Sequence, residues 1–103
     1  MSLTVVNEPD ASRYAILRDG ERIGVAEYTM RGANQIVFTH TEIEEARREK
    51  GMASTLVRSA LDDVRANSDR RVVATCPYVR HWLREHPEYQ DLLKRNESGS
   101  AGS

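Results

Sequence analysis

The clearest pattern in the sequence is a set of apolar residues at three- and four-residue spacings that follows Gly51. Its members are Met52, Leu56, Val57, Ala60, Leu61 and Val64. This spacing places all of them on one face of an amphipathic helix. Polar residues at positions 67–69 interrupt the pattern, so it predicts one helix that begins after Gly51 and ends there.

Two runs of strand-forming residues precede this helix and surround a turn. Residues 12–18 and 21–28 flank the dipeptide Asp19-Gly20, which favours a tight hairpin. A third strand is predicted over residues 34–41. Because each connection between these runs is short, we expect the three strands to form an antiparallel meander.

A further strand follows the helix. Residues 72–76 form a short apolar run with little alternation, which is typical of a strand covered on both faces. A strand, a helix and a second strand within about 40 residues predict a βαβ unit with a right-handed crossover.

Two helical segments are predicted near the C-terminus. Pro77 ends the preceding strand and suits the first turn of a helix over residues 78–84. The inward-facing residues of this helix are expected to be Val79, Trp82 and Leu83. After a break at His86 and Pro87, residues 88–94 predict a final helical turn or two.

Together these elements predict a single α/β (α+β) domain over residues 1–95. A chain of 103 residues can build one compact core without a metal or disulfide staple, because a domain of this size buries about two-thirds of its unfolded surface. Residues 96–103 contain nothing to bury, so we expect a disordered tail.

Composition narrows the classes of function. Lysine and arginine total 15 and aspartate and glutamate 16, for a net charge of −1, and no basic block is interleaved with aromatic residues. This argues against a nucleic-acid partner. The apolar runs are too short for a transmembrane helix, and no positive charge precedes the first apolar residues as in a signal peptide. We therefore expect no membrane partner.

Cysteine content bears on the compartment and on metals. Cys76 is the only cysteine, which excludes an internal disulfide and fits a reducing cytoplasm. One cysteine and three histidines also argue against a structural zinc site, so no metal is expected.

Charged and small residues meet at the start of the predicted helix, in the pattern Arg48-x-x-Gly51-x-Ala53. A helix start leaves several backbone N–H groups unpaired and carries the positive end of the helix dipole, so it can hold an anion. Gly51 lets the backbone approach a phosphate, and Arg48 or Lys50 adds positive charge. The arrangement suits a pyrophosphate; on these residues alone, a charged loop before a surface helix is the alternative.

In order and spacing, these elements resemble the GNAT superfamily of acyl-CoA-dependent N-acetyltransferases, in particular its small single-domain branch. The resemblance covers residues 5–94. It rests on Phe-Thr-His-Thr-Glu-Ile at 38–43, Arg-Glu-Lys-Gly-Met-Ala-Ser at 48–54, Cys-Pro-Tyr-Val at 76–79 and His-Pro-Glu-Tyr at 86–89.

The resemblance implies a minimal GNAT-like fold with a V-shaped splay between the central strands. It also implies acetyl-CoA as the cosubstrate and a small amine or a protein amine as the acceptor. The chain lacks the long N-terminal helices that form much of the acceptor pocket in other GNAT enzymes, so the resemblance identifies no particular acceptor.

The same resemblance implies where the cosubstrate binds. The pyrophosphate would lie over the backbone N–H groups of residues 49–54, and the pantetheine arm would run beside the strand end near Glu42 like an extra strand. The thioester would then point toward Cys76. The implied cosubstrate-binding residues are Ile43, Arg48, Glu49, Lys50, Gly51, Met52, Ala53, Ser54 and Tyr78.

Acetyl transfer to an amine needs a base for the amine and a proton for the departing thiolate. His40 is the first candidate base because imidazole titrates near neutral pH, and Glu42 is the alternative. Cys76 can protonate the thiolate, or carry the acetyl group covalently after activation by His40. Tyr78 or Tyr89 is the alternative acid.

Other interpretations of these residues stay open. His40 shares strand parity with Ile36 and Phe38, which is also the pattern of a core histidine, and Cys76 can be a small buried hydrophobe. Two other functions compete with the enzyme: a CoA- or acyl-CoA-binding module without efficient transfer, and a protein-interaction domain on the same scaffold. We expect a monomer or a weak homodimer.

Overall fold

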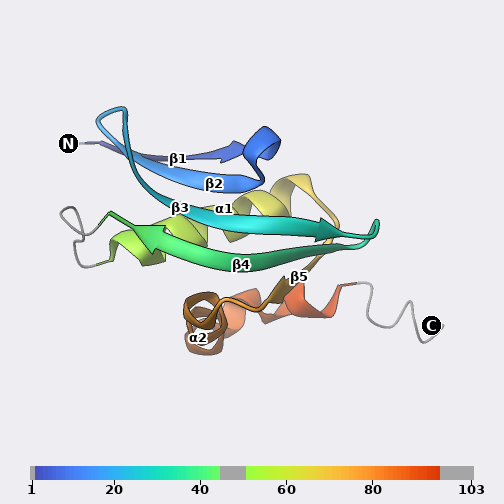
Figure 1. Cartoon of the computed structure of the whole chain (residues 1–103). Coiled ribbons are helices and arrows are strands. Elements are labelled where there is room, and N and C mark those ends of the chain that lie inside the picture. The colour runs from blue at the N-terminus through green and yellow to red at the C-terminus, as the bar shows by residue number, and fades with distance from the viewer. Residues whose placement is uncertain (1, 45–50, 96–103) are drawn as a thin grey trace.

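The computed structural model describes residues 2–44 and 51–95 of the chain. A five-stranded sheet is combined with helices that follow its fourth and fifth strands, and Figure 1 shows α1 behind the strands and α2 close to β5. In chain order the elements are β1 (Leu3–Glu8), η1 (Pro9–Ala11), β2 (Arg13–Arg18), β3 (Glu21–Arg31), β4 (Gln35–Ile43), α1 (Met52–Asn67), β5 (Arg71–Ala74), α2 (Pro77–Glu85) and η3 (Pro87–Lys94).

The strand order is β1-β2-β3-β4-β5. Neighbours from β1 to β4 pair antiparallel, whereas β4 and β5 pair parallel across the α1 crossover. The predicted meander and βαβ unit are therefore confirmed. The sequence pattern misses β1, whose side chains are mostly exposed because it is an edge strand paired only with β2.

The turn between β2 and β3 has the predicted geometry. Asp19 has a φ of 51° and Gly20 a φ of 86°, so both central residues of the two-residue turn are left-handed. Such a turn matches the twist of the strands that it joins. The hairpin predicted from the Asp-Gly dipeptide is confirmed.

A bulge in β4 decides where the polar residues of this strand point. Glu27 pairs with His40 and the next residue, Tyr28, pairs with Phe38, so Thr39 is an extra residue on β4. An extra residue shifts the two-residue alternation of side chains by one position. His40 is therefore exposed although Phe38 is buried, and the alternative of a core histidine is wrong.

The two parallel strands separate partway along β4. Their pairing ends at Phe38 and Ala74, whereas β4 continues to Ile43. The Phe38 carbonyl accepts from the backbone N–H groups of Thr75 (3.0 Å) and Cys76 (3.1 Å), and then the chain turns into α2. The strand predicted over residues 72–76 is thus shorter, and Cys76 is the N-cap residue of α2. Beyond this point, β4 has no β5 partner, which is the splay that the resemblance implies.

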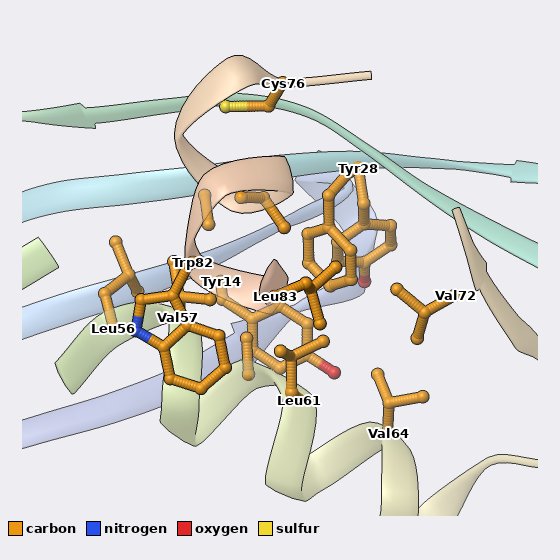
Figure 2. Close-up of a cluster of buried hydrophobic side chains, with 14 of the residues drawn as sticks. Tyr14, Tyr28, Leu56, Val57, Leu61, Val64, Val72, Cys76, Trp82 and Leu83 are labelled. Carbon is orange, nitrogen blue, oxygen red and sulfur yellow. The ribbon is translucent and has the colours of Figure 1, made fainter. Parts of the chain in front are cut away.

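The core lies between the sheet and the two helices. Every apolar residue predicted on the inner face of α1 is buried, as are Val79, Trp82 and Leu83 of α2. Figure 2 shows part of this cluster, in which side chains of α1 and α2 meet Tyr14 and Tyr28 of the sheet. Cys76, at the start of α2, belongs to the same core cluster. Burial of this apolar stripe is what holds α1 across the sheet.

Gly24 of β3 allows the sheet to pack tightly where β4 ends. A Cβ atom at this position would meet Ile43 Cδ1 at 2.5 Å, the Glu42 carbonyl oxygen at 2.9 Å and Ile16 Cγ2 at 3.2 Å. We expect Gly24→Ala to lower the free energy of unfolding by roughly 1–3 kcal/mol, the usual cost of overpacking. Urea denaturation measures this, and adding Ile43→Val should recover part of the loss because it removes the Cδ1 atom. Unchanged stability in Gly24→Ala would contradict the tight packing.

The predicted C-terminal tail, residues 96–103, lies outside the described residues. Deleting residues 98–103 should shift the melting temperature by no more than about two degrees, because they contain no apolar residue larger than alanine. A larger drop in a thermal melt would show that the tail docks on the domain. Within residues 2–44 and 51–95, no helix is long and apolar enough to span a membrane.

Candidate active site

A cavity of about 630 Å³ opens where β4 leaves β5 and α1 begins. It is lined from β4, from the first turn of α1 and from the start of α2. Its lining residues are His40, Thr41, Glu42, Ile43, Gly51, Ala53, Ser54 and Tyr78. Elements far apart in the sequence thus enclose one space at the carboxyl end of the parallel strands, where sheets of this kind usually hold ligands.

Most of the predicted site residues line this cavity. Cys76 and Met52 do not; both are buried, and Met52 belongs to the core stripe of α1. Thr41 is a lining residue that the sequence interpretation missed. Arg48, Glu49 and Lys50, predicted to bind the cosubstrate, lie outside the described residues.

The helix start at Gly51 has the features of an anion site. Gly51 is the N-cap of α1 with a φ of 85°, and its carbonyl accepts from the Thr55 N–H at 2.9 Å. The next backbone N–H groups, from Met52 to Ser54, have no carbonyl partner within the helix. Among residues 2–44 and 51–95, a Cβ atom on Gly51 would meet nothing within 4 Å, and Gly51 lines the cavity.

His40 and Glu42 form a polar pair at the cavity. Their side chains lie on the same face of β4, with His40 Nε2 3.4 Å from Glu42 Oε1, and they are 55% and 69% exposed. An accessible imidazole beside a carboxylate can take up a proton and return it to solvent. The bulge at Thr39 turns this face of β4 outward, so the exposure of the pair depends on strand pairing rather than on local sequence.

Cys76 is buried, with 4% of its surface exposed, and its neighbour in the cavity wall is Thr41. Thr41 Oγ1 lies 3.5 Å from Cys76 Sγ. Successive side chains of a strand point to opposite faces, so His40 and Thr41 point apart. The structure therefore brings Thr41 to the thiol and gives His40 a different neighbour, Glu42.

The two candidate tyrosines have different surroundings. Tyr78 lines the cavity and is 37% exposed, and burial raises the pKa of its phenol, so it stays protonated near neutral pH. Tyr89 is buried and donates its hydroxyl hydrogen to Asp62 Oδ1 at 2.7 Å. Of these two phenols, only Tyr78 reaches the cavity with a proton to give.

Comparison with known proteins identifies the family. Residues 13–92 match the model of the GCN5-related N-acetyltransferase family. Protein NATD1 of Bos taurus is 35% identical over 65 residues, and NATD1 of Homo sapiens is 34% identical over 65 residues. Each match covers 63% of this chain and 57% of the relative, so the chain aligns with little more than half of NATD1.

Solved structures share the fold at low identity. A GCN5-like protein from Staphylococcus aureus superposes with a TM-score of 0.66 at 21% identity, over 89% of both chains. Ribosomal-protein-alanine N-acetyltransferase from Brucella melitensis gives a TM-score of 0.57 at 18% identity, over 72% of this chain and 59% of that one.

N-acetylglutamate synthase from Neisseria gonorrhoeae, solved with coenzyme A and N-acetyl-glutamate, gives a TM-score of 0.53 at 17% identity, over 82% of this chain and 24% of that one. At these identities, the solved structures establish only a shared fold. The sequence match over residues 13–92 establishes the family. On that match, the chain belongs to the GCN5-related N-acetyltransferase family.

Proposed function

We propose that this chain transfers the acetyl group of acetyl-CoA to the nitrogen of an amine. The observation that carries the proposal is the cavity between the diverging strands, which ends on the first N–H groups of α1, whose carbonyl partners are missing within the helix. The family and the coenzyme A in one structural neighbour support the choice of cosubstrate. The acceptor is an amine on a small molecule or a protein.

Each part of the cosubstrate has a chemically matched part of the cavity. The pyrophosphate suits the N–H groups after Gly51 and the hydroxyl of Ser54, with Arg48 and Lys50 of the preceding segment as the cations. The pantetheine arm suits residues 41–43 of β4, where the strand has lost its β5 partner and can pair with the amide groups of a ligand. Ile43 provides apolar wall beside this stretch.

The amine must be neutral before its nitrogen attacks the thioester carbon. We assign His40 to take the amine proton; its ring lines the cavity and lies beside Glu42, which supports this role. Glu42 is the alternative base. As the new C–N bond forms, the C–S bond breaks and the sulfur of CoA leaves as a thiolate.

The thiolate needs a proton, and Cys76 and Tyr78 are the two proposed donors. Tyr78 lines the cavity, whereas Cys76 is buried with its Sγ 3.5 Å from Oγ1 of Thr41, which does line it. In the alternative route, the Cys76 thiolate attacks the thioester carbon and forms an acetyl-cysteine, which the amine then cleaves. Both routes end with acetylated amine and free CoA.

Two further parts of the proposal rest on the sequence alone. The single cysteine favours a reducing cytoplasm as the compartment. The near-neutral charge and the absence of a basic block argue against nucleic acid as a partner. A monomer or weak homodimer stays the expected state.

Turnover of acetyl-CoA distinguishes an enzyme from a binding module and from a protein-interaction domain. The chain is incubated with acetyl-CoA and pooled polyamines, amino acids and peptides, and free CoA and acetylated products are followed by mass spectrometry. An acetylated amine that requires the chain supports the proposal. Tight CoA binding without product in any pool would favour a binding module, and no effect of CoA on the melting temperature would favour a protein-interaction domain.

A further inference from the structure

A buried tryptophan holds the Ser54 hydroxyl from outside the cavity. Trp82 Nε1 donates to Ser54 Oγ at 2.8 Å, which links α2 to the first turn of α1. Ser54 lines the cavity, whereas Trp82 is 3% exposed and belongs to the core. Figure 2 shows the indole, with its blue nitrogen, beside Leu56 and Val57 of α1.

The surroundings of Trp82 leave its ring little freedom. The His86 ring stacks on it with centroids 3.7 Å apart and planes 13° apart, and the Tyr89 ring meets it edge-on at 5.1 Å. The Arg58 guanidinium lies over the indole at 5.4 Å. His86 Nδ1 is 2.7 Å from the Trp82 carbonyl oxygen, and since a carbonyl only accepts, Nδ1 carries the hydrogen of this bond. The indole N–H is therefore held in one direction, toward Ser54.

This direction decides what the Ser54 hydroxyl can offer a ligand. A hydroxyl has one hydrogen to donate and two lone pairs that accept. The indole N–H of Trp82 donates to one lone pair of Ser54 Oγ. The hydroxyl hydrogen therefore cannot be directed at the indole nitrogen, which is itself a donor. The hydroxyl hydrogen is directed away from the indole, and Ser54 lines the cavity beside the first backbone N–H groups of α1, which have no carbonyl partner within the helix. The Ser54 hydroxyl and the backbone N–H groups at this end of the cavity are donors, which suits a phosphate, a group with only acceptors at neutral pH.

We propose that Trp82 is a positioning residue for the pyrophosphate of CoA: its N–H orients the Ser54 hydroxyl so that this hydroxyl donates to a phosphate oxygen. The inference rests on the proposed function, because it takes CoA as the ligand of this cavity. It assigns to a core residue, outside the cavity, a specific part in ligand affinity.

A double-mutant cycle tests the coupling. The dissociation constant of CoA is measured by calorimetry for the unmodified chain, Ser54→Ala, Trp82→Phe and the double variant. Losing a hydrogen bond to a charged group should weaken binding about tenfold in Ser54→Ala. Trp82→Phe alone should weaken CoA binding about threefold, since the Ser54 hydroxyl is kept and loses only its orientation. In a chain that already carries Ser54→Ala, Trp82→Phe should have no further effect on CoA binding.

A second replacement of Trp82 distinguishes the loss of its N–H group from the packing damage that the smaller phenylalanine ring causes. Trp82 is the only tryptophan, so growth on a benzothiophene analogue of tryptophan replaces this residue alone and removes the N–H while keeping the ring shape. The analogue should reproduce the loss of affinity without a lower melting temperature.

Each other outcome has a distinct meaning. Equal losses from Trp82→Phe in both backgrounds, or full affinity with the analogue, would overturn the coupling while CoA binding stands. Failure of the unmodified chain to bind CoA would overturn the proposed function itself, and this inference with it.

Discussion

Replacing Gly51 with valine should abolish the stabilisation that CoA gives to the folded chain. The side chain would project into the open space at the cavity, where a phosphate has to approach the N–H groups of α1. A ligand at 100 times its dissociation constant stabilises a protein by about 2.7 kcal/mol, and this increment should disappear. Thermal melts with and without CoA measure it.

Gly20 offers a matched control for this substitution. Its φ of 86° is nearly that of Gly51, and a Cβ atom there also meets nothing within 4 Å. Gly20→Val should therefore carry the same backbone strain, roughly 1–2 kcal/mol for a left-handed residue, at a position that does not line the cavity. It should lower the melting temperature yet keep the full CoA response. A Gly51→Val chain that responds to CoA as the unmodified chain does would place the ligand elsewhere.

Replacing Cys76 with alanine should reduce acetyl transfer by about a hundredfold or more, the usual contribution of a proton-transferring group. CoA affinity should change little, because Cys76 is buried and does not line the cavity. Steady-state kinetics and calorimetry on the same preparation separate the two effects. Transfer that survives in Cys76→Ala would leave direct attack by the amine, with His40 or Glu42 as base.

The reactivity of the thiol distinguishes a chemical role from a structural one. A reactive Cys76 should be alkylated, CoA should slow the alkylation, and His40→Gln should slow it more at neutral than at high pH if His40 activates the thiol. Thr41→Val tests the neighbour that the structure shows, because it removes the hydroxyl 3.5 Å from the sulfur and keeps the shape of the side chain. A structural cysteine would resist the reagent with or without CoA.

The parts of the fold that sequence predicts well are those whose signal is local. The stripe on α1 extends over four turns, and the Asp19-Gly20 turn requires left-handed residues that the dipeptide supplies. β1 escapes prediction because an edge strand with little burial shows no alternation. The extent of β5 is also misjudged, since apolar residues continue past Ala74 into the start of α2.

The site depends more on tertiary structure. Gly51, Ala53 and Ser54 can be predicted because helix-start chemistry is local. The outward direction of His40 and the contact of Thr41 with Cys76 cannot be predicted in this way, because both follow from the extra residue in the β3–β4 pairing. Counting alternate residues along a strand predicts the wrong face for side chains beyond a bulge, and bulges are common near functional sites.

Residue-resolved NMR during a titration with acetyl-CoA tests the central claim most directly, because it reports where on the chain the cosubstrate binds. The largest and saturable changes should be at the backbone amides of Gly51, Ala53 and Ser54 and of residues 41–43 on β4. Gly20 and Gly32, in turns that do not line the cavity, should change little. No saturable change, or changes centred on Arg80 and Arg84 of α2 instead, would contradict acetyl-CoA binding in this cavity.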